Sequence, residues 1–131
     1  MSERFHHPIT AQLTDIDDLG HVSNLVYLRW VLEAATAHSV ARGWGQHEYF
    51  AIRSVWVVRR HELDYLAQVT AGQELVAETW VDSWKAASCV RKTELVRDGQ
   101  IVLRAATTWA FMSMTTGKPM RIDERVRAAF P

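Results

Sequence analysis

The sequence predicts an α+β fold in which a curled antiparallel sheet wraps around one long central helix. A proline-free run from 24 to 42 is apolar on most of its circumference, which is typical of a helix that is buried on most sides. The second half of the chain alternates apolar and polar residues in long segments separated by tight turns, as antiparallel strands do. A single apolar helix is hidden only if such a sheet curls around it.

The central helix has recognisable ends. Ser23 or Asn24 is a good N-cap, and Gly43 is a good stop because glycine adopts the left-handed conformation without a steric penalty. At 1.5 Å per residue the helix would be about 28 Å long. Arg29 and Glu33 make it too polar to span a membrane, and we interpret Glu33 as a buried partner in an ion pair or hydrogen bond.

The other elements follow from local patterns. We expect a strand within 5–14, a loop at 44–48, a strand over 52–62 that continues or becomes an extended segment over 63–69, strands over 74–84, 87–97 and 101–114, and a short helix over 124–129. Asp98 and Gly99 are typical of a hairpin turn, and Asp123 is a suitable cap for the last helix. We find no repeat or linker, so residues 1–131 are expected to form a single domain.

Composition excludes several classes of function. Fifteen basic and fifteen acidic residues give a net charge of zero, which argues against a general nucleic-acid binder. Cys89 is the only cysteine, so we expect no internal disulfide, a reducing compartment and a buried thiol. The first eight residues lack the apolar core of a signal peptide, which predicts a soluble, cytoplasmic protein without membrane contact. Six tryptophans predict an aromatic pocket or partner surface, and strands that are apolar on both faces predict a homo-oligomer.

An acidic loop precedes the central helix. Asp15, Asp17 and Asp18 lie there with Gly20 and His21. The free amides and the positive dipole end of a helix N-terminus favour an oxyanion, and a carboxylate beside them could activate water or attack a carbonyl carbon. The same residues also suit ordinary dipole pairing and turn formation, which is how we interpret Asp15 and Asp18. No His, Cys or Asp spacing completes a metal site, so we predict neither metal nor cofactor.

This loop resembles the active-site motif of the hotdog-fold thioesterases, specifically the 4-hydroxybenzoyl-CoA thioesterase-like and acyl-CoA thioesterase group. The matching residues are Asp17-Asp18-Leu19-Gly20-His21-Val22-Ser23-Asn24 followed by Tyr27. Two less specific blocks, 64–73 and 107–119, follow in the family's order, so the resemblance extends from about 5 to 122. The plant-type acyl carrier protein thioesterases place a working asparagine where this chain has Leu19, so their mechanism is not expected here.

The resemblance implies a hotdog fold and the hydrolysis of an acyl-CoA or acyl carrier protein thioester to a carboxylic acid and a thiol. Asp17 would be the general base or nucleophile, the amides near Asn24 and Ser23 would form the oxyanion site, and His21 would assist. The site would lie between the subunits of a homodimer or homotetramer. Beside these catalytic residues we place a set of substrate contacts, in which the arginines would bind the phosphates of CoA: Ser23, Tyr27, Arg59, Arg60 and Arg91.

Two alternatives stay open. An acyl-thioester dehydratase on the same fold would have Phe-Pro before Gly20-His21, which this chain lacks. A non-catalytic acyl-CoA-binding domain would not require Asp17, so the presence of this residue argues against it.

Overall fold

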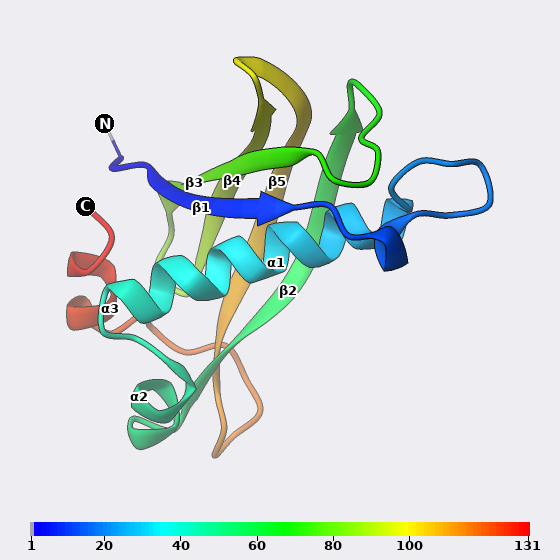
Figure 1. Cartoon of the computed structure of the whole chain (residues 1–131). Helices are drawn as coiled ribbons and strands as arrows, with labels where there is room; N and C mark the ends of the chain where they lie inside the picture. Colours follow the sequence, from blue (N-terminus) through cyan, green and yellow to red (C-terminus); the bar gives the residue numbers. More distant parts are fainter. Residues whose placement is uncertain (1) are drawn as a thin grey trace.

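One five-stranded antiparallel sheet curls around a long helix in the computed structural model, which describes residues 2–131 (Figure 1). The strands are β1 (Phe5–Thr10), β2 (Ser54–Tyr65), β3 (Glu74–Trp84), β4 (Ser88–Arg97) and β5 (Gln100–Ser113), and their order in the sheet is β1-β3-β4-β5-β2. The helices are α1 (Asn24–Ala41), α2 (Gln46–Ala51) and α3 (Glu124–Ala128), with a 3₁₀ turn η1 (Leu13–Asp15). The predicted α+β fold with a curled sheet and a central helix is confirmed.

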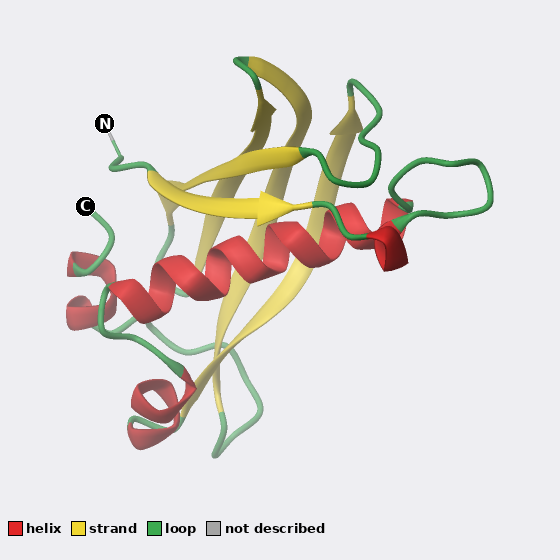
Figure 2. Cartoon of the chain, viewed as in Figure 1, coloured by secondary structure: helices red, strands yellow, loops and turns green. Residues whose placement is uncertain are grey.

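The ends of α1 are those that the sequence predicts. The Ser23 hydroxyl accepts a hydrogen bond from the Leu25 N–H at 3.3 Å, and Gly43 follows the helix with φ +84°. The helix crosses the concave face of the sheet (Figure 2). Among residues 2–131, no helix is long and apolar enough to cross a membrane.

The prediction that α1 is buried on most faces is wrong for a single chain. One face is buried, with Val31 and Ala34 at its centre, but Leu25 and Val40 on the opposite face are exposed. The predicted ion pair of Glu33 is confirmed, because its carboxylate lies 3.3 Å from Arg29, but its predicted burial is wrong, because its side chain is 49% exposed. The apolar residues of this outer face remain free to contact a second chain.

The sheet buries alternate residues, as the pattern of the strands predicts. The buried face of β3 contains Leu75, Ala77, Thr79 and Val81. The core divides into two clusters along α1. One lies under the N-terminal half of the helix and includes Tyr27, Trp30, Leu95 and Leu103. The other lies at the C-terminal end, is rich in aromatic residues, and includes Tyr49, Phe111, Ile122 and Phe130.

Two local predictions need correction. The predicted loop at 44–48 contains the start of α2, because the Glu48 carboxylate accepts a hydrogen bond from the Gly45 N–H at 2.9 Å and Tyr49 is buried beneath the helix. The first strand ends at Thr10, where the chain turns into η1. The predicted last helix and its Asp123 cap are confirmed, since the Asp123 carboxylate accepts from the Arg125 N–H at 2.9 Å.

Candidate active site

A buried carboxylate anchors the loop that contains Asp17. Asp15 is 4% exposed, and its two carboxylate oxygens accept hydrogen bonds from Arg29 Nη2 and from the Gln12 N–H, both at 2.8 Å. Burial opposes ionisation of Asp15, but these hydrogen bonds outweigh it and hold its pKa below the usual 3.8. Asp15 is therefore a structural residue that ties the loop to α1, as we interpreted it.

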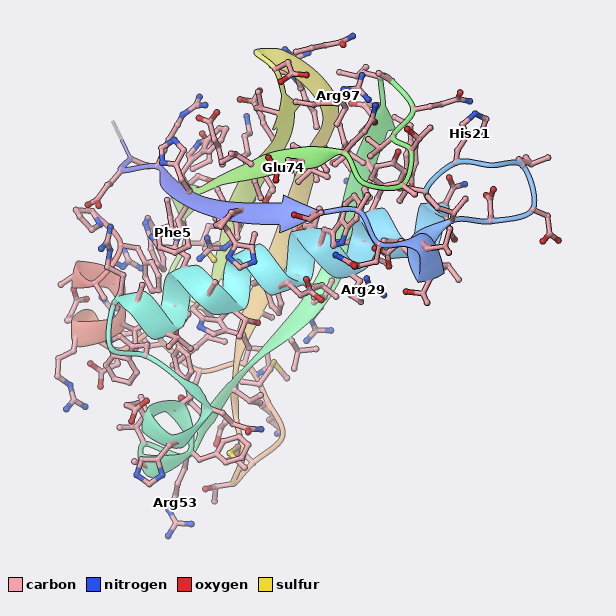
Figure 3. The ribbon with its side chains drawn as sticks, in the orientation of Figure 1. Phe5, His21, Arg29, Arg53, Glu74 and Arg97 are labelled. Carbon is pink, nitrogen blue, oxygen red and sulfur yellow. The ribbon has the colours of Figure 1, made fainter. Side chains whose placement is uncertain are left out.

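The loop itself is a tight reversal in front of α1. Ile16 and Val22 form a bridge at its base. The Asp17 N–H donates to the His21 carbonyl at 2.9 Å, and the Gly20 N–H donates to the Asp17 carbonyl at 3.1 Å. Gly20 has φ +84°, a backbone conformation that favours glycine. The chain thereby brings Asp17 and His21 together, and Figure 3 shows His21 on this projecting loop.

The Asp17 side chain is exposed to solvent. One carboxylate oxygen accepts a hydrogen bond from the Leu19 N–H at 2.9 Å, and the other accepts none from the part of the chain that the structure describes. Among residues 2–131, no group of three or more His, Cys, Asp or Glu side chains could hold a metal ion. Asp17 thus presents a free oxygen on a surface that its own chain leaves open.

One amide is unpaired at the start of α1. The Ser23 N–H donates to the Asp15 carbonyl at 3.0 Å, so the prediction that this amide contributes to the oxyanion site is wrong. Ser23 itself accepts from Leu25 through its hydroxyl and from the Val26 N–H through its carbonyl, at 2.9 Å in the latter case. The Asn24 N–H alone in this first turn donates to no acceptor within residues 2–131. It is the amide best placed to bind an oxyanion.

Tyr27 lies in the core, one turn into α1. Its ring is buried and packs edge-on against Tyr65 with 5.5 Å between ring centroids. Its hydroxyl accepts a hydrogen bond from the Val69 N–H at 3.2 Å, and burial raises the pKa of this phenol above its ordinary value. Tyr27 is thus a packing residue with a satisfied hydroxyl, which is the role that its position one turn into the helix favours, and its contact with substrate stays a prediction.

The three predicted arginines lie in different environments. Arg59 and Arg60 are exposed on β2, an edge strand, where the pairing with β5 shifts register. Arg91 is 6% exposed on the inner face of β4 and donates to His38 Nδ1 at 2.8 Å. Burial does not match a role for Arg91 in holding phosphates at the surface. We identified no role for His38 from the sequence.

Several apolar side chains are exposed on the Asp17 loop and on other segments of the chain. They come from η1, from the loop itself, from the start of α1 and from the end of β2, and are Leu13, Leu19, Leu25, Tyr65 and Leu66. Apolar residues that gather on a surface mark a site of contact with another molecule. Exposed apolar side chains therefore occur on both sides of Asp17 in the sequence, at Leu13, Leu19 and Leu25.

Solved structures of similar fold include several thioesterases. A 1,4-dihydroxy-2-naphthoyl-CoA thioesterase from Synechocystis is 16% identical with a TM-score of 0.89, over 97% of this chain and 95% of that chain. A gentisyl-coenzyme A thioesterase is 16% identical with a TM-score of 0.85, over 98% and 100%. A hypothetical protein from Staphylococcus aureus, solved in complex with CoA, is 12% identical with a TM-score of 0.92, over 98% and 82%. These similarities confirm the hotdog fold.

A search of the curated proteins finds no significant match to this sequence. A family model described as the thioesterase-like superfamily matches residues 11–130. This match includes the Asp17 loop, α1 and every strand except β1. The chain therefore belongs to the thioesterase-like superfamily.

Proposed function

We propose that the protein hydrolyses an acyl-CoA or acyl carrier protein thioester to a carboxylic acid and a free thiol, with Asp17 as the catalytic carboxylate. Membership of the superfamily supports a thioester hydrolase. The observation that supports the site is the loop geometry: the Asp15–Arg29 pair ties Asp17 to the start of α1, where the Asn24 amide is unpaired. Residues 1–131 would act as one catalytic domain in the cytoplasm, where the lone buried Cys89 stays reduced.

The chemistry follows from these two groups. The Asn24 N–H would stabilise the negative charge that develops on the thioester oxygen. The free oxygen of Asp17 would either take a proton from an attacking water or attack the carbonyl carbon to form a mixed anhydride that water then cleaves. In both routes the C–S bond breaks and the thiolate leaves, to be protonated as CoA or carrier thiol. His21 would orient Asp17 or the substrate.

We propose that a second copy of the chain completes the site, in a homodimer or homotetramer. Three observations support this: Asp17 is exposed, the apolar side chains of Leu19 and Leu25 near it in the sequence are exposed, and the outer face of α1 is open. The edge strand β2 pairs with β5 on one side only. Arg59 and Arg60 on this strand would bind the phosphates of CoA, a ligand that one structure of the same fold contains.

The test is a thiol-release assay with aromatic, short-chain and long-chain acyl-CoA and with an acyl carrier protein. We expect Asp17→Asn to lower kcat/KM about 10²–10⁴-fold, the usual contribution of a positioned acid or base. Asp18→Asn removes an exposed carboxylate from the same loop and should leave turnover unchanged. Turnover by Asp17→Asn at the rate of the unmodified protein would rule out this site.

The exposure of Asp17 is also compatible with the alternative function, a non-catalytic acyl-CoA-binding domain. Calorimetry with the same acyl-CoA panel separates the two functions. Tight binding without thiol release would indicate an acyl-CoA-binding domain. Light scattering coupled to size-exclusion chromatography gives the oligomeric state, and an active monomer would contradict a site shared between subunits.

A further inference from the structure

A cavity of about 250 Å³ lies at the C-terminal end of α1, between this helix, α2 and the sheet. Its wall is largely aromatic and includes Trp44, Tyr49, Trp56, Trp84, Trp109 and Phe130. Figure 1 shows α2 and α3 near this end of α1, with the Asp17 loop beyond the other end. His38, which contacts the cavity residue Arg91, follows Asn24 by 14 positions, and this separation corresponds to about 21 Å along a helix. The cavity is therefore remote from the proposed catalytic residues of the same chain.

Arg91 introduces a buried positive charge into the wall of the cavity. Its Nη1 donates to His38 Nδ1 at 2.8 Å and to the Thr79 hydroxyl at 3.1 Å, and both acceptors are neutral groups. Burial lowers the pKa of Arg91 to about 10, so the guanidinium is still charged at neutral pH. A buried charge is costly unless an opposite charge compensates it.

The cavity wall provides no such opposite charge. Neither an aspartate nor a glutamate lines it. Cys89 and Tyr49 are its ionisable neighbours, but burial raises the pKa of Cys89 to about 12 and raises that of Tyr49 above its ordinary value, so both are neutral. The wall residue Trp109 also has a buried indole Nε1–H without an acceptor in the part of the chain that is described. Arg91 and Trp109 thus both have hydrogen-bond donors without an acceptor in the described residues.

The hydrogen bonds of Arg91 leave one edge of its guanidinium group, formed by Nε and Nη2, without a partner within residues 2–131. His38 is fixed between Phe5, which stacks on it at 5.0 Å, and the edge-on ring of Phe130, also at 5.0 Å. Burial and the charge of Arg91 lower the pKa of His38 to about 3, so it stays a neutral acceptor for Nη1. Within residues 2–131 no hydrogen bond uses Nε or Nη2 of Arg91. These two N–H groups form the fork that binds a carboxylate through two parallel hydrogen bonds.

We propose that this cavity binds a small aromatic monocarboxylate, whose carboxylate pairs with Arg91 and whose ring packs among the tryptophans. The anion compensates the buried charge, and the indole walls provide the apolar, planar contact surface that an aromatic ring favours. Cavities that hold drug-sized ligands measure about 300–1,000 Å³, so the smaller volume here favours an acid of one or two rings. The proposed catalytic loop of the same chain lies near the other end of α1 (Figure 1), and binding of the acid to this cavity does not depend on thioester hydrolysis.

Calorimetric titration of the full chain with 2-naphthoate and with 2-naphthylmethanol tests the role of charge. The two probes have nearly the same shape, but only the first is an anion. We expect the alcohol to bind at least about tenfold more weakly, because it lacks the charge-assisted hydrogen bonds to the guanidinium. Equal affinity for the two probes, or no binding of 2-naphthoate, would overturn the proposal.

Variants locate the binding site. Arg91→Met retains an unbranched side chain without the charge and should lose at least about tenfold in affinity for 2-naphthoate while still binding the alcohol. Arg104→Met removes an exposed arginine from the neighbouring strand and should change neither affinity. Asp17→Asn should also bind 2-naphthoate normally, and loss of binding there would place the ligand in the thioesterase site and overturn the assignment. If Arg91→Met does not fold, the Trp109 indole N–H resonance in the unmodified protein must shift on addition of 2-naphthoate, and an unchanged resonance would contradict the proposal.

Discussion

The charged residues at the two ends of α1 lie in opposite environments: one is exposed to solvent and the other is buried. At the N-terminal end, Asp17 is exposed on the loop that precedes α1, and the Asn24 N–H at the start of this helix has no acceptor within residues 2–131. At the C-terminal end, Arg91 is enclosed by aromatic rings and contacts only neutral acceptors. A solvated carboxylate requires no compensation from the protein, whereas a buried guanidinium does. In our two proposals, a partner chain would therefore exclude water from the open end, and a ligand would supply a negative charge to the closed end.

The loss of stability when a side chain is truncated should differ most between the two ends of α1. Phe111 is fully buried in the aromatic cluster, so we expect Phe111→Ala to lower the free energy of unfolding by about 3–5 kcal/mol. Leu19→Ala at the open end removes an exposed side chain and should change it by less than about 0.5 kcal/mol in the monomer. Urea denaturation measures both. Similar losses for the two variants would show that the open end is packed in solution, as a partner chain would make it.

The same contrast explains what could be predicted from the sequence. Regular alternation places Arg91 on the inner face of its strand with Cys89 and Leu95, so its burial follows from the same periodicity that predicts the strand. We assigned Arg91 to the phosphates of CoA with the other arginines, and did not use this periodicity to ask whether its side chain is buried. The six tryptophans predict an aromatic pocket or partner surface, and Trp44, Trp56, Trp84 and Trp109 do line the cavity. Its location could not be predicted, because the wall combines α1, α2, the sheet and Phe130 from distant parts of the sequence.

Local patterns were sufficient for the helices that have clear caps, and they failed where tertiary contacts decide. The ends of α1 follow from Ser23 and Gly43. The short helix α2 was missed because burial of Tyr49 stabilises it, and nothing in its own six residues indicates that burial. The Asp17 loop was located by its motif. Whether a second chain covers Asp17 could not be predicted from the local sequence pattern.

The ion pair that anchors the open end should also contribute to stability. We expect Asp15→Asn to lower the free energy of unfolding by about 2 kcal/mol at pH 7, because it removes the charge from two hydrogen bonds of a buried carboxylate. The pKa of Asp15 is lower in the folded chain than its usual 3.8, so its contribution is complete above that value and is lost as the pH falls through the folded pKa. Urea denaturation at pH 7 and at about pH 2 measures the change.

Asp18→Asn is the matched control for this prediction, because Asp18 is exposed in the same loop. It should have almost no effect on stability at either pH. An Asp15→Asn variant that is as stable as the unmodified protein at pH 7 would show that the Asp15–Arg29 pair does not hold the loop.

At the C-terminal end of α1, the contribution of His38 to the free energy of unfolding should change over a wide pH range. His38 has a pKa of about 3 in the folded chain, where burial and the charge of Arg91 lower it from 6.5. Below pH 6.5 the unfolded chain binds a proton at His38 that the folded chain does not. Stability should therefore fall as the pH decreases from 6.5 toward 3, by about 1.4 kcal/mol per pH unit for this one group. Urea denaturation at half-unit intervals between pH 7 and pH 4.5 gives the slope.

Two histidine variants separate this effect from other titrations. His38→Gln keeps an oxygen that can accept from Arg91 but does not titrate, so the slope in this pH range should become smaller. His47→Gln removes an exposed histidine of α2 and should leave the slope as it is. His61, whose pKa burial also lowers, would account for part of the slope that remains in His38→Gln. An unchanged slope in His38→Gln would mean that the imidazole takes up a proton in the folded chain, and a positively charged ring beside Arg91 would require that an anion already occupies this end of the molecule.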